Sequence, residues 1–234
     1  MHIGILRSLG TFLFRRIMKI KVNEIELNYE VIGQGKPLIF IHGNGEDLTT
    51  FDSLVEALKG FYTCYLIDSR NHGKSSKTTS YHYDDMAKDI YEFIKILDIK
   101  KPSLFGFSDG AIIGMILAFK YPDLLGKLIL AGGNINPLGV KKKFLKLMEE
   151  AYLNTKNPLI YLMLNEPNLS DKELSKIVCP VLILAGQNDV IKLSHTKKIH
   201  TYIRGSKLMI ISNHTHESYI MHSNYLKDII KNFA

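Results

Sequence analysis

The segment Gly106-Phe107-Ser108-Asp109-Gly110 constrains the fold of this chain more than any other stretch. A short strand-like run at 103–105 precedes it, and an apolar helical pattern at 111–119 follows it. Strand, sharp turn and helix form the setting in which a G-x-S-x-G pattern makes a nucleophile elbow, with the serine at a strained turn. The two flanking glycines remove β-carbons that would clash at such a turn. Gly114, one helical turn further on, lets the helix lie close to a sheet.

Strand patterns alternate with helical patterns through most of the chain. The predicted strands are 19–22, 24–31, 38–41, 62–67, 102–105, 127–131, 180–185 and 207–211. The predicted helices between and after them are 50–58, 84–97, 111–121, 194–203 and 217–233. Several strands are continuous apolar runs, which is typical of strands buried on both faces. This alternation predicts an α/β fold whose mostly parallel sheet carries helices on both faces.

Polar and glycine-rich segments follow the predicted strands. They lie at residues 42–45, 68–75, 106–110, 186–189 and 212–216. The carboxyl ends of parallel strands meet at one edge of a sheet, where active sites of such folds form. The sequence therefore predicts that these segments come together around Ser108.

The alternation stops between the strands at 127–131 and 180–185. Residues 134–176 carry helical patterns at 140–153, 159–164 and 171–177 and no strand pattern. We expect this stretch to form a helical cap over a core built from residues 18–133 and 177–234. Phe144, Met148, Tyr152 and Tyr161 are predicted to face the substrate pocket from this cap.

Composition indicates one ordinary globular domain. The chain has 234 residues, 46% of them hydrophobic and 23% charged, with a net charge of +7. The lysines are dispersed, and no nucleic-acid motif or zinc-type Cys/His spacing occurs, so we expect a solvated basic surface and no metal site. The two cysteines, Cys64 and Cys179, lie in or beside apolar runs and are predicted to be free thiols of a cytoplasmic protein.

Residues 1–17 stand apart from the rest of the sequence. They are apolar, carry three arginines and no acidic residue, and are too short to cross a bilayer. Two explanations are open: translation begins at Met18, or the segment is an amphipathic helix at a membrane surface. Stable membrane insertion is not expected in either case.

These motifs together resemble the α/β-hydrolase superfamily over residues 19–233. The resemblance rests on H-G-N-G at 42–45, D-S-R-N-H-G-K-S at 68–75, G-F-S-D-G at 106–110, G-Q-N-D at 186–189 and a histidine after the last strand. The order serine, acid, histidine along the chain is that of the superfamily. The resemblance implies the α/β-hydrolase fold, an eight-stranded sheet, a short helical cap and no cofactor.

The resemblance also implies a catalytic triad. Ser108 would be the nucleophile and Asp189 the acid that orients the histidine. Two histidines follow the last strand, and His216 occupies the spacing usual for the base better than His214 does. The strand after the elbow ends in Gly132-Gly133-Asn134, so the acid position used by some relatives holds no carboxylate.

The family pattern implies two backbone donors for an oxyanion, the N–H groups of Asn44 and Asp109. Asp109 departs from the Met, Gln or Leu often found after the serine. A carboxylate beside a developing oxyanion is unfavourable unless it points away or is paired. His42, Arg70 and His72 are expected to order the loops beside the elbow.

The function predicted from the sequence is a carboxylesterase-like serine hydrolase of small ester, thioester or related acyl substrates. Two alternatives use the same fold: C–C bond hydrolysis, lyase or acyl-transfer chemistry on the same triad, or a ligand-binding pseudoenzyme or receptor. The expected partner is a small acyl molecule, not nucleic acid. No prediction of oligomeric state follows from the sequence.

Overall fold

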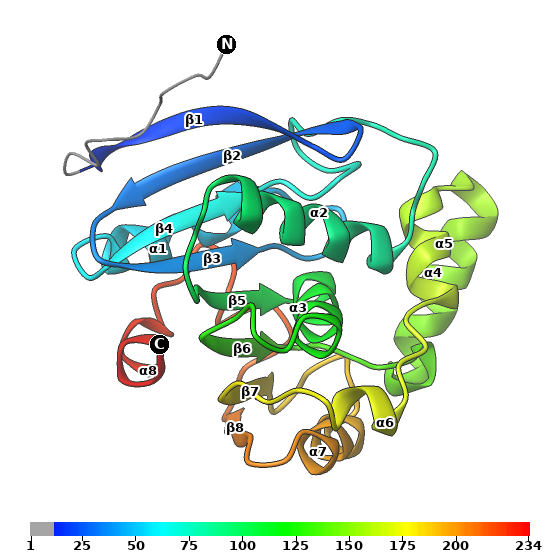
Figure 1. The fold of residues 1–234 in the computed structure, drawn as a ribbon. Coiled ribbons are helices and arrows are strands. Elements are labelled where there is room, and N and C mark those ends of the chain that lie inside the picture. Colours follow the sequence, from blue (N-terminus) through cyan, green and yellow to red (C-terminus); the bar gives the residue numbers. More distant parts are fainter. Residues whose placement is uncertain (1–11) are drawn as a thin grey trace.

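One eight-stranded sheet forms the centre of the computed structural model, which describes residues 12–234 (Figure 1). The strand order is β1-β2-β4-β3-β5-β6-β7-β8. The last six of these strands run parallel, whereas β2 pairs antiparallel with both β1 and β4. The strands are β1 (Phe12–Val22), β2 (Ile25–Gly33), β3 (Lys36–Ile41), β4 (Tyr62–Ile67), β5 (Ser103–Phe107), β6 (Lys127–Ala131), β7 (Val181–Gly186) and β8 (Lys207–Ile211). The predicted mostly parallel eight-stranded sheet is confirmed.

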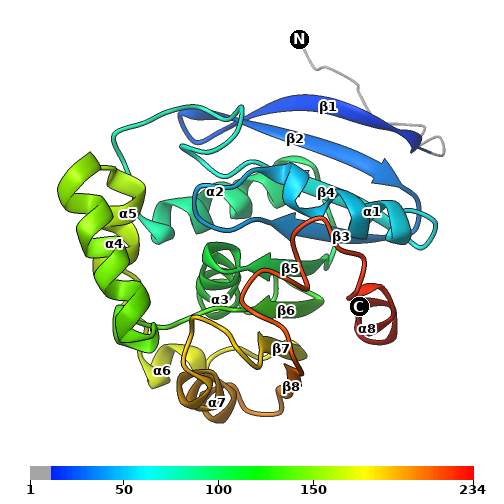
Figure 2. The ribbon, with the colours of Figure 1, turned by 180° about the vertical axis from the view of Figure 1, so that it is seen from behind.

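Helices cover both faces of this sheet. One face carries α2 (Tyr83–Ile96), α3 (Asp109–Lys120), α6 (Asp171–Leu174) and α7 (Leu193–Tyr202). The other face, seen in Figure 2, carries α1 (Asp52–Leu58) and α8 (Lys227–Phe233). Two short 3₁₀ turns, η1 (Leu48–Phe51) and η2 (Pro137–Gly139), lie in the connections. Each face buries its own apolar cluster, which explains why the central strands are apolar on both sides.

Helix α3 is the best-buried helix of the described chain and fixes the position of the elbow. Residues 109–119 are all buried, so the helix is enclosed on every side. A β-carbon at Gly114 would lie 2.9 Å from Leu128 and 3.1 Å from Leu104, both on strands of the sheet. The predicted close approach of helix and sheet at Gly114 is therefore confirmed.

Two helices, α4 (Lys142–Thr155) and α5 (Pro158–Asn165), stand at the carboxyl ends of the parallel strands (Figures 1 and 2). The polypeptide that carries them is tied to the core by backbone contacts. Val140 forms a β-bridge with Ile191, and the N–H of Leu169 donates to the carbonyl of Ile135. We refer to α4 and α5 as the cap; it is shorter than the expected 134–176, because α6 within that stretch packs on the sheet face with α3 and α7.

The structure corrects one interpretation of the N-terminus. Residues 12–17 belong to strand β1, which pairs with β2 from Phe12↔Gly33 to Val22↔Ile25, so an amphipathic helix over 1–17 is wrong for this part. Residues 1–11 lie outside the described residues. Residues 12–18 read Phe-Leu-Phe-Arg-Arg-Ile-Met and do not alternate apolar and polar residues, so it is pairing with β2 that extends the strand upstream of Lys19.

The predicted closing helix 217–233 is also wrong in its first half. Only Lys227–Phe233 is helical. His222 adopts a left-handed backbone with φ of 48°, and its N–H donates to the carbonyl of Thr50 at 3.1 Å. Tyr219 and Leu226, which lie on either side of this bend, are both fully buried.

Candidate active site

Ser108 sits at a strained turn between β5 and α3. Its backbone has φ of 53° and ψ of −112°, an unfavourable conformation for a residue with a side chain. Its N–H donates to the carbonyl of Ala131 at 2.8 Å, which anchors the turn to the neighbouring strand. A β-carbon at Gly106 would lie 2.2 Å from the carbonyl oxygen of Gly110, and one at Gly110 would lie 2.0 Å from that of Ile41. The two glycines of the motif are required by this crowding, as predicted.

Ser108, His216 and Asp189 come together at the carboxyl ends of three strands. Nε2 of His216 lies 3.1 Å from Oγ of Ser108, within reach of a hydrogen bond from the hydroxyl. Nδ1 of His216 donates to Oδ1 of Asp189 at 2.7 Å. Asp189 is fully buried, and its oxygens also accept from the N–H groups of Gly186 and Ile191. This arrangement can remove a proton from Ser108 and stabilise the resulting imidazolium.

His214 is turned away from this cluster. Its Nδ1 accepts a hydrogen bond from the hydroxyl of Ser218 at 3.0 Å, and its ring packs against Tyr219 and Tyr225. The ring of His216 instead packs on Phe107, with centroids 4.9 Å apart. Of the two candidate bases, His216 is the one within reach of Ser108.

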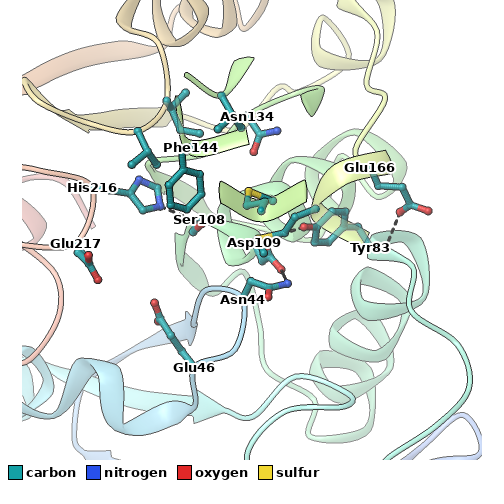
Figure 3. Close-up of a pocket in the computed structure, with 15 residues that line it drawn as sticks. Asn44, Glu46, Tyr83, Ser108, Asp109, Asn134, Phe144, Glu166, His216 and Glu217 are labelled. Carbon is teal, nitrogen blue, oxygen red and sulfur yellow. Dashed lines mark hydrogen bonds between the residues drawn. The ribbon is translucent and has the colours of Figure 1, made fainter. Parts of the chain in front are cut away.

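Asp109 follows Ser108 directly and is buried. Its carboxylate points away from the serine hydroxyl and toward Asn44 and Tyr83 (Figure 3). Tyr83 Oη donates to Oδ1 at 2.7 Å, and Asn44 Nδ2 donates to Oδ2 at 2.9 Å. Burial raises the pKa of the Asp109 carboxyl to about 6, while these two hydrogen bonds and nearby His216 oppose the shift. The unfavourable contact expected between this carboxylate and an oxyanion is thus relieved by pairing.

A cavity of about 210 Å³ opens over Ser108. Phe144 and Met148, one turn apart on α4, line it, as does Met163 of α5. Tyr152 and Tyr161 do not line it, and their rings pack against each other with centroids 5.4 Å apart. The pocket prediction therefore does not hold for these two tyrosines, whose rings contact each other between α4 and α5 instead.

Four carboxylate side chains line the cavity: Glu46, Asp109, Glu166 and Glu217. Of the lining residues, none is lysine or arginine, although the whole chain is basic. Sequence reasoning identified Asp109 and missed the other three. Glu46 directly follows the H-G-N-G motif, and this position could have indicated that it lies near the site. Glu166 and Glu217 lie in irregular segments with no motif.

Glu46 supports the loop that carries Asn44. Its Oε2 accepts from the N–H of Gly43 at 3.1 Å and from the hydroxyl of Thr50 at 2.9 Å. Burial raises the pKa of its carboxyl. Glu46 therefore stiffens the turn directly after β3.

The loop after β4 has a structural role, as expected. Arg70 makes a two-point ion pair with buried Asp89, at 2.6 and 2.8 Å. His42 accepts from the N–H of Ser69 at 3.1 Å, and its ring packs against that of His72. Burial lowers the pKa of His42 to about 4, so the ring is a neutral acceptor near neutral pH. None of these side chains lines the cavity.

Two kinds of feature are absent from residues 12–234. No three metal-ligating side chains gather in one place within that range. No helix in the same range is long and apolar enough to cross a membrane.

Comparison with known proteins relates more than half of the chain to one family. A family model described as alpha/beta hydrolase fold matches residues 36–159. The human protein "Serine hydrolase BPHL" is 25% identical over 249 residues, which cover 92% of this chain and 85% of that protein. A "2-(acetamidomethylene)succinate hydrolase" of Mesorhizobium japonicum is 34% identical over 112 residues, 47% of this chain and 40% of the relative.

A solved structure resembles nearly the whole chain. The meta-cleavage product hydrolase CumD of Pseudomonas fluorescens IP01 superposes with a TM-score of 0.77 at 19% identity. The match covers 92% of this chain and 96% of that chain. At this identity the likeness shows the shared fold.

Proposed function

The chain belongs to the α/β-hydrolase fold family, and we propose that it is a serine hydrolase of small esters or thioesters. One observation carries the proposal: Ser108 Oγ lies 3.1 Å from His216 Nε2, whose Nδ1 donates to buried Asp189, at the floor of a cavity. A base within hydrogen-bond reach of a serine, itself oriented by a carboxylate, is the arrangement that activates a hydroxyl for acyl transfer.

The proposed reaction has two halves. Oγ of Ser108 attacks the acyl carbon while its proton passes to Nε2 of His216, and the carbonyl oxygen becomes an oxyanion between the N–H groups of Asn44 and Asp109. The C–O or C–S bond then breaks, and His216 returns the proton to the leaving alcohol or thiol. A water molecule attacks the acyl-enzyme, passes its proton to His216, and releases the acid as Ser108 recovers its hydrogen.

Size and charge of the cavity narrow the substrate class. A volume of about 210 Å³ lies below the range of about 300–1,000 Å³ typical of sites for drug-sized ligands, which supports a small acyl group. Four carboxylates in the lining disfavour a second carboxylate or a phosphate on the substrate. We therefore propose neutral or cationic esters over anionic ones.

The proposal is tested with a fluorophosphonate probe and p-nitrophenyl esters of increasing chain length. We expect wild type to be labelled and to hydrolyse acetate and butyrate esters fastest, with a loss of at least about 10³-fold in Ser108→Ala. A monosuccinyl ester of matched length is expected to react more slowly than the neutral butyrate. His214→Ala serves as the matched control for His216→Ala.

The outcomes separate the rival functions. Labelling that persists in Ser108→Ala contradicts the nucleophile assignment. Loss of activity in His214→Ala with activity retained in His216→Ala contradicts the choice of base. Labelling of wild type without turnover of any ester or thioester points to C–C bond hydrolysis, lyase or transferase chemistry, or to a binding role.

A further inference from the structure

The carboxylate of Asp109 joins two segments that are distant in the sequence. Asp109 begins α3, and Asn44 lies in the loop after β3. Asn44 Nδ2 donates to Asp109 Oδ2 at 2.9 Å, and Tyr83 Oη donates to Oδ1 at 2.7 Å, so each carboxylate oxygen holds one donor (Figure 3). The direction of the carboxylate is therefore fixed from both sides.

The same two residues carry the backbone N–H groups to which the proposed function assigns the oxyanion. The position of one donor relative to the other depends on how the β3 loop sits beside the start of α3. Glu46 fixes the loop internally through Gly43 and Thr50. The bond between Asn44 and Asp109 is a direct side-chain link between the two donor residues themselves.

We propose that Asp109 is a positioning residue whose carboxylate, by holding the side chain of Asn44, sets the spacing of the two oxyanion donors. This inference rests on the proposed serine-hydrolase function. Oxyanion donors stabilise a transition state only when they are held at the correct distance before the reaction, and small displacements are costly.

The cost of burying the charge of Asp109 supports a functional role for this residue. Burial raises the pKa of Asp109 to about 6, so near neutral pH the protein holds a carboxylate in an environment that opposes its charge. The groups facing it are Tyr83, Asn44, His216 and Glu46. A buried carboxylate with this cost is typical of a functional position rather than of a stabilising one.

A second explanation is that the charge of Asp109 contacts the substrate. Asparagine separates the two roles because it has nearly the same shape and no charge. Its amide can accept from Asn44 through oxygen and donate to Tyr83 Oη through nitrogen, so the link survives. Asp109→Ala removes both the link and the charge.

The test compares Asp109→Ala, Asp109→Asn, Asn44→Ala and the double variant Asp109→Ala/Asn44→Ala with p-nitrophenyl acetate as substrate. Two readouts are measured: the split between kcat and KM, and the rate constant for fluorophosphonate labelling of Ser108, which needs the same donors but no turnover. Asp123→Asn makes the same change at an exposed carboxylate near the opposite end of the sheet and serves as control. Circular dichroism and thermal melting check that each variant is folded.

We expect Asp109→Ala and Asn44→Ala each to lower kcat by about 30- to 100-fold with KM within about threefold. The double variant is expected to be no more than about twofold worse than the poorer single variant, because both changes break the link between Asn44 and Asp109. Asn44→Ala also removes the bond to the carbonyl of Leu159, and Asp109→Ala also removes the bond from Tyr83. Asp109→Asn is expected to recover activity to within about fivefold of wild type.

Three results overturn the proposal. The first is an Asp109→Ala variant that keeps wild-type kcat and labelling rate. The second is an Asp109→Asn variant that falls as far as Asp109→Ala, which assigns the role to charge. The third is multiplication of the two single effects in the double variant. If Asp109→Ala does not fold, the kcat values of Asn44→Ala and Asp109→Asn test the proposal: wild-type kcat in Asn44→Ala, or an Asp109→Asn variant as impaired as Asn44→Ala, overturns it. A wild type whose ester hydrolysis is unaffected by Ser108→Ala contradicts instead the proposed function.

Discussion

His82 of the core lies against Glu166 of the segment that leaves the cap, with Nδ1 of the imidazole 2.6 Å from Oε1 of the carboxylate. The other oxygen of Glu166 accepts from the N–H of Tyr83 at 3.2 Å. Asn44 Nδ2 also donates to the carbonyl of Leu159 in α5 at 3.2 Å. The cap is therefore fastened to the core by polar contacts at two points.

The His82–Glu166 contact predicts that the cap opens more often as the pH rises. The hydrogen bond to Glu166 raises the pKa of His82, and Asp84 and Asp85 act in the same direction. A raised histidine pKa means that the contact is strongest below about pH 6.5 and is lost as the pH rises through the raised value. Hydrogen exchange of the α5 amides, corrected for intrinsic rates, is expected to show less protection at pH 8.5 than at pH 6.

His82→Ala is the control for this prediction. It should remove the pH dependence of α5 protection and leave the protection of α3 unchanged. Equal protection of α5 at both pH values in wild type would contradict the idea of a pH-sensitive contact.

Asp109→Asn is expected to stabilise the folded protein above neutral pH. The folded pKa of about 6 lies above the ordinary value of 3.8, so the folded state binds this proton more tightly than the unfolded state does. Stability associated with Asp109 is therefore greatest below pH 3.8 and declines as the pH rises through 6. The decline amounts to at most about 3 kcal/mol, and the uncharged asparagine avoids it.

Thermal melting checks this expectation. At pH 8 we expect Asp109→Asn to have the higher Tm, by up to about 10 °C, with a smaller difference at pH 4. A lower Tm than wild type at both pH values would show that the carboxylate stabilises the fold.

Tyr83→Phe removes one of the two hydrogen bonds that hold Asp109 ionised. The Tyr83 hydroxyl lowers the pKa of that carboxyl, so its loss is expected to move the pKa above about 6. A protonated Asp109 holds Asn44 through a neutral hydrogen bond, as asparagine does, so its protonation should lower kcat by no more than about fivefold, and in Tyr83→Phe this acid limb should shift to higher pH. At pH 8 the free energy of unfolding should fall by about 1.5–3 kcal/mol, since a buried charge has lost a partner.

The pH–rate profile in Asp109→Asn and in the double variant Tyr83→Phe/Asp109→Asn is the control. With no titrating carboxyl at 109, Tyr83→Phe should leave the acid limb in place. A shift that persists in the asparagine background would assign the limb to another group.

Gly132→Ala is expected to disable the histidine without unfolding the protein. Gly132 has φ of 64°, and a β-carbon there would lie 2.7 Å from Cε1 of His216 and 2.9 Å from Nδ1. The imidazole would have to move out of line with Ser108, so kcat should fall by about 10²-fold or more. Steady-state kinetics, with circular dichroism to confirm folding, measures this.

Gly205→Ala separates the clash from backbone strain. Gly205 has a similar φ of 74°, but a β-carbon there would meet nothing within 4 Å. We expect Gly205→Ala to lower stability slightly and to leave kcat near wild type. Equal losses in both variants would attribute the effect to strain alone.

Local sequence patterns were sufficient for the parallel part of the fold. Continuous apolar runs such as 38–41 predicted strands buried on both faces, and small residues around Ser108 predicted the turn between β5 and α3. A short stretch of consecutive residues is enough to indicate a buried strand or a tight turn, so these features could be predicted locally. The helix predicted over 217–233 was wrong in its first half because the chain bends at His222, whose N–H donates to the carbonyl of Thr50. Thr50 is far away in the sequence, so no local pattern indicates this contact.

The sequence by itself determined the succession of strands and helices along the chain, the elbow at Ser108, and the short list of chemically active residues after the strands. Spacing already favoured His216 over His214, and the tertiary structure brings its Nε2 to 3.1 Å from Oγ of Ser108. Only the tertiary structure decided that Asp109 turns toward Asn44 and Tyr83. It also brought Glu166 to the cavity wall. The physical reason is that hydrogen bonds between segments far apart in the chain depend on side-chain direction, which packing sets and spacing does not encode.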